Sequence, residues 1–122
     1  MPGNKAFGDR IRQLREAKKQ HDARFSLRKF AEAVDLSPTF LSKMEVGDFD
    51  PPKPEKIKKM AELLGVDADD LLALAGKVDP ALSDIIKEQP QAMADFLRTA
   101  RDTNLSEDEL RKLTDKLRRR KD

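Results

Sequence analysis

The sequence predicts an all-α protein, on three observations. Apolar residues recur at helical spacing, as Phe7, Ile11 and Leu14 do at i, i+4 and i+7. The stretches with this spacing begin at capping residues or prolines, and several end at glycine. Of the 122 residues, 38% are hydrophobic and 39% are charged, so the core is modest and the surface is heavily charged. We therefore expect one small helical domain with an extension.

Five helices are expected in residues 1–78, each with a recognisable start. The N-caps are side chains that can accept a hydrogen bond from a free backbone N–H, namely Asn4, Ser26, Ser37 and Asp67. The remaining helix starts at Pro54, where the missing N–H costs nothing. The expected helix ranges are 5–20, 27–34, 38–46, 54–64 and 68–75. A loop that contains the exposed His21 joins the first two helices, and Leu74 is expected to face the core with Leu71 and Leu72.

Residues 79–122 predict three further short amphipathic helices. Helix starts are marked by Pro80, by Pro90 and by the capping-box spacing of Ser106 and Glu109. The apolar side chains that recur along these helices are Leu82, Ile85, Ile86, Met93, Phe96, Leu97, Leu110, Leu113 and Leu117. Each helix has more apolar surface than it can bury alone. The extension therefore either folds back on the domain or pairs with a second chain, and we favour pairing.

The composition excludes several classes of function. The chain has no Cys, one His, no glycine-rich phosphate loop and no evident convergent pair of carboxylates. We therefore expect no disulfide framework, no metal site, no cofactor and no enzyme activity. No stretch has the character of a signal peptide or the length of a membrane span, so we expect a cytoplasmic protein with no membrane partner.

The segment from Ser26 to Gly47, SLRKFAEAVDLSPTFLSKMEVG, reads as two short helices joined by a tight turn. It resembles the helix-turn-helix of the Cro and phage-repressor type, the xenobiotic-response-element type of transcriptional regulator. The resemblance extends from about Phe7 to Leu74. It implies a five-helix DNA-binding domain whose third helix enters the major groove of double-stranded DNA, in a homodimer that usually acts as a repressor.

The resemblance implies a set of DNA contacts on the exposed side of the third helix. The family positions that meet base edges correspond to Pro38, Thr39, Phe40 and Lys43, and Ser37 and Ser42 are better placed for phosphate. Arg28 or Lys29 is expected to replace the phosphate-binding Gln that is common in the family, and Lys53 is a further expected phosphate contact. A threonine hydroxyl can donate to or accept from a base, and a lysine can donate to guanine. Phe40 either belongs to the core or packs on a thymine methyl group.

The resemblance also implies an internal ion pair between Arg15 and Glu45, for which the alternative is two exposed charges. Three features depart from the family pattern. Leu27 stands where a phosphate-binding Gln is common, and Asp35 stands where the turn usually has Gly. The loop after the third helix, often basic, carries Asp48 and Asp50 here, which would repel phosphate.

Charge is distributed unevenly along the chain. The net charge is only +2, but residues 1–47 carry ten Lys and Arg against six Asp and Glu. A positive excess in the segment that holds the motif suits phosphate binding, although a solvated surface has the same appearance. We predict a DNA-binding transcriptional regulator that reads a palindromic operator and dimerises through residues 79–122. The alternative is a protein-interaction adaptor, and the sequence identifies no small-molecule effector.

Overall fold

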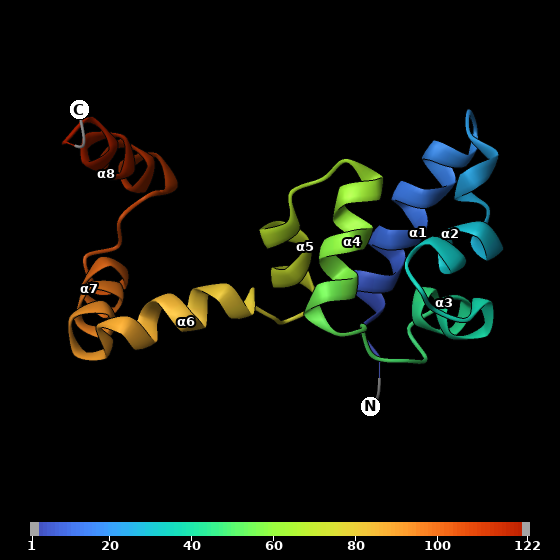
Figure 1. Ribbon diagram of the computed structural model, residues 1–122, viewed down its shortest axis with the longest axis horizontal. Coiled ribbons are helices and arrows are strands. Elements are labelled where there is room, and N and C mark those ends of the chain that lie inside the picture. The colour runs from blue at the N-terminus through green and yellow to red at the C-terminus, as the bar shows by residue number, and fades with distance from the viewer. Residues whose placement is uncertain (1–2, 121–122) are drawn as a thin grey trace. The chain divides into compact units, whose positions relative to one another are not determined.

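The computed structural model describes residues 3–120, which are built from helices without strands (Figure 1). The chain divides into two compact units, Met1–Pro80 and Ala81–Asp122. The first unit holds α1 (Lys5–Lys19), η1 (Ala23–Phe25, a 3-10 helix), α2 (Leu27–Ala33), α3 (Pro38–Glu45), α4 (Pro54–Leu64) and α5 (Ala68–Leu74). The remaining helices are α6 (Pro80–Glu88), α7 (Pro90–Asp102) and α8 (Glu107–Arg120). The predicted all-α fold, five helices followed by three, is confirmed.

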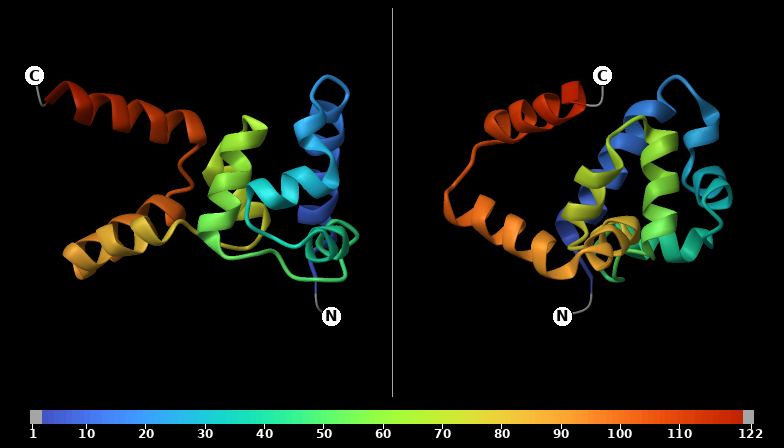
Figure 2. Two further views of the ribbon diagram at one scale, coloured as in Figure 1. Left: turned by 45° about the vertical axis from the view of Figure 1, so that its right-hand side comes forward. Right: turned by 60° about the vertical axis from the view of Figure 1, so that its left-hand side comes forward.

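The core of the first unit lies where its five α-helices meet. Helix α3 packs against α1 and α2, and α4 packs against α1 and α5 (Figure 2). The largest fully buried side chains are Phe7, Ile11, Phe30, Leu41, Met44, Ile57, Met60 and Leu72. Burial of one such side chain contributes about 1.5–3 kcal/mol, so this cluster is the main source of the unit's stability.

The predicted N-caps form in the first unit. The Asn4 side chain accepts from the Phe7 N–H at 2.9 Å, and the Ser37 hydroxyl accepts from the Phe40 N–H at 3.0 Å. Ser26 and Asp67 accept in the same way from residues three positions later. Each cap satisfies a backbone donor that has no partner inside its helix.

Helices α1 and α3 come unusually close together at Gly8. A Cβ atom at Gly8 would collide with the carbonyl oxygen of Met44 and lie 2.7 Å from that of Glu45. Both are backbone atoms of α3, so a larger side chain at Gly8 would force the two helices apart. This close approach is not predictable from the sequence, because nothing in the local context of Gly8 distinguishes it from any other helical glycine.

One expectation about burial in the first unit was wrong, and the linker between α1 and α2 contains structure that the sequence did not predict. The linker between α1 and α2 is not a plain loop, because Asp22 caps η1 and Phe25 enters the core. Leu74 is 38% exposed rather than buried. At 100° per residue it lies about 110° from the centre of the α5 face that Leu71, Leu72 and Ala75 bury. The helices that we expected to end at residues 20, 34, 46 and 75 end one residue earlier, and those residues are the C-caps.

The second unit forms its helices without a core. Ser106 and Glu109 make the predicted capping box, in which the Ser106 N–H donates to the Glu109 carboxylate at 3.0 Å and the Glu109 N–H donates to the Ser106 hydroxyl at 3.1 Å. None of the described residues of α6, α7 and α8 is buried. Within residues 3–120, no helix combines the length and apolar character that crossing a membrane requires.

Candidate nucleic-acid interface

Helices α2 and α3 pack against each other across a tight turn. The Leu36 N–H donates to the Ala31 carbonyl at 2.8 Å, which closes the end of α2. Asp35 adopts a left-handed backbone with φ 57°, the conformation that its place in the turn requires. Ala31 is fully buried, and its small side chain permits the close crossing of the two helices.

Helix α3 has one buried face and one polar exposed face. Leu41, Met44 and Glu45 are buried against α1 and α2. The predicted contact residues are exposed, except for the half-buried Phe40; they are Ser37, Pro38, Thr39, Ser42 and Lys43. Positions three or four residues apart on a helix lie on the same side, so the fold brings these side chains together on one surface.

The residues expected at phosphate also remain accessible. The Ser37 hydroxyl oxygen accepts the capping hydrogen bond, which leaves its own proton free for donation. The Arg28 side chain is 82% exposed, with its Nε 3.7 Å from the Glu32 carboxylate. Lys53 is exposed at the start of α4. Asp50, in the acidic loop, accepts from the backbone N–H of Gly3 at 2.7 Å.

An aromatic contact connects the exposed face of α3 to the loop that follows it. The Phe40 and Phe49 rings lie 5.5 Å apart, and the Lys43 ammonium lies 5.9 Å from the Phe49 ring centroid. The N–H groups of Asp48 and Phe49 both donate to the Lys43 carbonyl, at 2.8 and 3.3 Å. Phe40 also packs against the core. Phe49 therefore orders the chain around Lys43.

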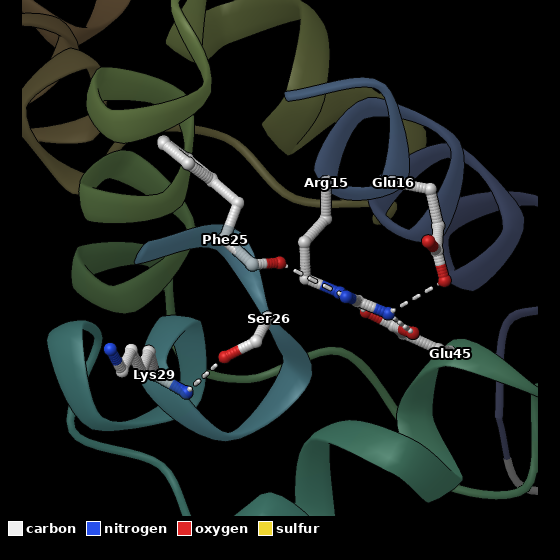
Figure 3. Close-up of polar contacts among 6 residues, drawn as sticks. All are labelled: Arg15, Glu16, Phe25, Ser26, Lys29 and Glu45. Carbon is white, nitrogen blue, oxygen red and sulfur yellow. Dashed lines mark hydrogen bonds and ion pairs between the residues drawn. The ribbon is translucent and has the colours of Figure 1, made fainter. Parts of the chain in front are cut away.

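Arg15 and Glu45 form a buried ion pair that fixes α3 against α1 (Figure 3). Arg15 donates through Nε at 2.8 Å and through Nη2 at 2.9 Å to the two carboxylate oxygens of Glu45. Its Nη1 donates to the Phe25 carbonyl at 3.1 Å, so the same guanidinium also holds η1. Both charged side chains are only 3% exposed. The hydrogen bond to Glu45 raises the pKa of Arg15 and outweighs the opposing effect of burial.

This arrangement of five helices agrees with the comparisons to known proteins. Residues 6–74 match a protein family described as "Helix-turn-helix domain". The chain belongs to this family. The assignment to a helix-turn-helix regulator family that we made from the sequence is therefore confirmed, and α2 and α3 are the two helices of the motif.

The chain is 32% identical over 96 residues to the "Uncharacterized HTH-type transcriptional regulator RghRB" of Bacillus subtilis (strain 168). The match covers 77% of this chain and 66% of that relative. Two crystal structures of the clp gene regulator ClgR from Corynebacterium glutamicum are also similar. One is 30% identical with a TM-score of 0.46 and covers 60% of this chain and 87% of its own. The other is 27% identical with a TM-score of 0.48, and the match covers 83% of this chain and 93% of the ClgR chain.

Two further residues contribute to the helix-turn-helix domain without having been predicted from the sequence. The Lys56 ammonium donates to the Asp35 carbonyl at 2.6 Å and lies 3.4 Å from the Asp35 carboxylate, so it ties α4 to the turn of the motif. Phe49 orders the loop beside Lys43, and an aromatic residue two positions after Gly47 is the only signal for this in the sequence. Within the described residues, no group of His, Cys, Asp or Glu side chains could hold a metal ion.

Proposed function

We propose that this protein is a sequence-specific DNA-binding regulator of transcription that places α3 in the major groove. The observation that carries the proposal is the construction of α3. Its exposed face is polar, and its buried face is fixed to α1 through the bidentate Arg15–Glu45 pair. A rigid helix with a polar outer face can hold donors and acceptors in register with base edges.

The exposed side chains fall into two groups, one suited to contact bases and one suited to contact phosphates. Thr39 and Lys43 read bases, because a hydroxyl and an ammonium can discriminate the donors and acceptors of the major groove. Pro38 and Phe40 flank them and offer apolar surface to thymine methyl groups. Contacts to phosphate position the domain without reading sequence. The residues for these contacts are Arg28, Ser37, Ser42 and Lys53.

The complete regulator is a homodimer that reads a palindromic operator and acts as a repressor in the cytoplasm, without a cofactor or enzyme activity. One reading helix covers too few base pairs to select a site in a genome, and a symmetric pair places two such helices about 34 Å apart. The extension supports this part of the proposal, because its apolar side chains include Phe96 and Leu117, which are 55% and 56% exposed. We assign dimerisation to residues 79–122 and reading to residues 1–78.

The test begins with an operator selected from random DNA, followed by gel-shift titrations over a range of salt concentrations. Thr39→Ala and Lys43→Ala should lose about 1–3 kcal/mol of discrimination between operator and random DNA. Arg28→Ala should weaken binding to both DNAs equally and reduce the salt slope by about one. Lys59→Ala removes another exposed lysine of the same domain, outside α3, and should leave discrimination unchanged.

Two results would count against the proposal. Selection of no preferred sequence, together with a shallow salt slope, would favour the adaptor function instead, with the acidic loop at Asp48 and Asp50 as its contact surface. Normal discrimination by both α3 variants would show that the reading surface lies elsewhere.

A further inference from the structure

Helix α8 carries a leucine stripe with the spacing of a coiled coil. Leu110, Leu113 and Leu117 are 41%, 42% and 56% exposed, and they follow one another at intervals of three and four residues. This is the a, d, a order of a heptad repeat, in which two helices pack along a narrow seam. No residue of α8 is buried, so the leucine side chains of the stripe stay accessible to a partner helix.

The charges at the two ends of α8 indicate how a second helix would lie. The first turn holds Glu107, Asp108 and Glu109, and the last turn holds Arg118, Arg119 and Arg120. Two parallel copies would bring like charges together at both ends. Two antiparallel copies bring the acidic turn of each beside the basic turn of the other. Opposite charges are favoured in such juxtapositions and like charges are disfavoured.

The charged positions beside the seam also favour the antiparallel arrangement. With Leu110 and Leu117 at a, the residues before them, Glu109 and Lys116, occupy g. In an antiparallel pair the g positions of the two helices face each other, so Glu109 of one chain meets Lys116 of the other, twice. The ion pairs inside α8, Arg111–Glu107 at 2.7 Å and Lys112–Asp108 at 3.1 Å, do not use either residue.

We propose that α8 docks against α8 of a second copy of this chain as an antiparallel two-helix coiled coil, with Leu110 against the partner's Leu113 and Glu109 paired with the partner's Lys116. This deepens the homodimer of the proposed function and rests on it. The partner is a second copy of this chain because the acidic first turn of α8 is complementary in charge to the basic last turn of an antiparallel α8. The stripe on α8 and the charges beside it thereby serve a single interface.

The test uses two full-length charge reversals, Glu109→Lys and Lys116→Glu, in sedimentation equilibrium without DNA. Each variant alone replaces two opposite-charge contacts by two like-charge contacts, which should raise the dimer Kd about tenfold. An equimolar mixture of the two variants restores both opposite-charge contacts in the mixed dimer. The mixture should therefore return to within about twofold of the unmodified chain, and 0.5 M salt should shrink the differences between samples.

Two controls separate charge pairing from damage to the helix. Glu109→Gln removes the charge but keeps a side chain suited to the capping box with Ser106, so it should have a smaller effect than Glu109→Lys. Lys112→Glu makes the same reversal as Lys116→Glu at position c, away from the seam, and should leave the dimer Kd unchanged. Circular dichroism of every variant reports whether the total helix content, to which α8 contributes, is unchanged.

Three outcomes would overturn the inference. Failure of the mixture to recover affinity would exclude the antiparallel pairing of positions 109 and 116. Dimers that do not respond to either reversal would show that another surface holds the chains together. An unmodified chain that stays monomeric at micromolar concentration would overturn both the inference and the homodimer. Gel-shift discrimination by the unmodified chain is measured separately, so a failure of DNA reading is distinguishable from a failure of the α8 interface.

Discussion

The five-helix unit and the extension consist of the same kind of helix but use their apolar residues differently. Helix α4 buries Ile57, Met60, Ala61 and Leu64. Helix α7 is two residues longer and also amphipathic, yet it buries none of its residues. Capping residues and helical spacing are local properties that form a helix in either place. Burial depends on neighbouring helices, which the five-helix unit supplies for itself and the extension does not.

Ion pairs show the same contrast. The Arg15 and Glu45 side chains are 3% exposed, and they connect residues 30 positions apart. The Arg111 and Glu107 side chains of α8 are 73% and 79% exposed, and they connect successive turns of one helix. The buried pair fixes one element against another, whereas the exposed pair adds only a little to the stability of its own helix.

The largest expected effect comes from removing an aromatic ring in each region. Phe30→Ala should cost about 4 kcal/mol of the stability of the five-helix unit, because it empties a fully buried site. Phe96→Ala should change that stability by less than about 0.5 kcal/mol and weaken dimerisation instead. Native-state hydrogen exchange of the α1 and α4 amides measures the first effect, and sedimentation measures the second. Equal losses of protection in the two variants would mean that Phe96 contributes to the core.

The next effect concerns the two kinds of ion pair. Glu45→Ala should destabilise the protein by about 3 kcal/mol, because it removes both short hydrogen bonds to a buried carboxylate and leaves the Arg15 guanidinium with the Phe25 carbonyl and the half-exposed Glu16, 3.5 Å away. Glu107→Ala in α8 and Lys43→Ala on the exposed face of α3 should each cost less than about 0.5 kcal/mol. Thermal unfolding followed by circular dichroism compares the three variants. Equal melting temperatures for Glu45→Ala and Lys43→Ala would contradict the role of Glu45 in fixing α3.

Close packing of helices distinguishes the regions as well, since the extension contains no glycine. Gly8→Ala should cost about 2 kcal/mol, because the new methyl group meets the backbone of α3. Gly76→Ala should cost only about 1 kcal/mol, because its Cβ meets nothing within 4 Å and only its left-handed φ of 73° is unfavourable. Urea unfolding measures both. A neutral Gly8→Ala variant would show that α1 and α3 can separate without loss.

The smallest expected effect is on the pKa of a capping carboxylate. Hydrogen bonds lower this pKa in both regions. Hydrogen bonds from Arg24 lower the pKa of Asp22 to about 2, and the hydrogen bond from Ser106 lowers the pKa of Glu109. A lowered carboxyl pKa favours the folded state above the ordinary value of 3.8, and this contribution is lost as the pH falls toward 2. Carboxyl NMR titration of Arg24→Ala should show the Asp22 pKa moving up toward 3.8. An unchanged pKa would exclude the Arg24 side chain as the cause, because the backbone N–H of residue 24 still donates to Asp22 in this variant.

Local signals in the sequence were sufficient to predict the helices. Capping residues and prolines correctly marked the starts of α1 through α8, because a helix end requires partners for free backbone groups wherever it occurs. The burial of Phe25 and the exposure of Leu74 were not predicted. Phe25 follows charged residues and enters the core only because η1 turns it inward. Leu74 satisfies the spacing rule for α5 but lies at the edge of the buried face.

The candidate site was also predictable only in part, because some of its contacts do not follow from local signals in the sequence. The exposed positions of α3 follow from helix periodicity once its buried stripe is recognised. The contacts of Phe49 with Phe40 and Lys43, and of Lys56 with Asp35, join segments that are distant in sequence or lie in irregular loops. No spacing rule predicts such contacts. They form only because the folded chain brings the loop after α3 back beside α3, and α4 beside the turn after α2.

The bond from Arg15 to the Phe25 carbonyl has a consequence for the evolution of the domain. It fixes the far end of the linker from α1, so the start of α2 is positioned independently of the path that residues 20–24 take. Residues can be gained or lost around the exposed His21 without shifting α2 or α3. A domain with this arginine can vary its linker length and still hold the start of α2 in place, which makes the linker a natural place for new sequence to accumulate.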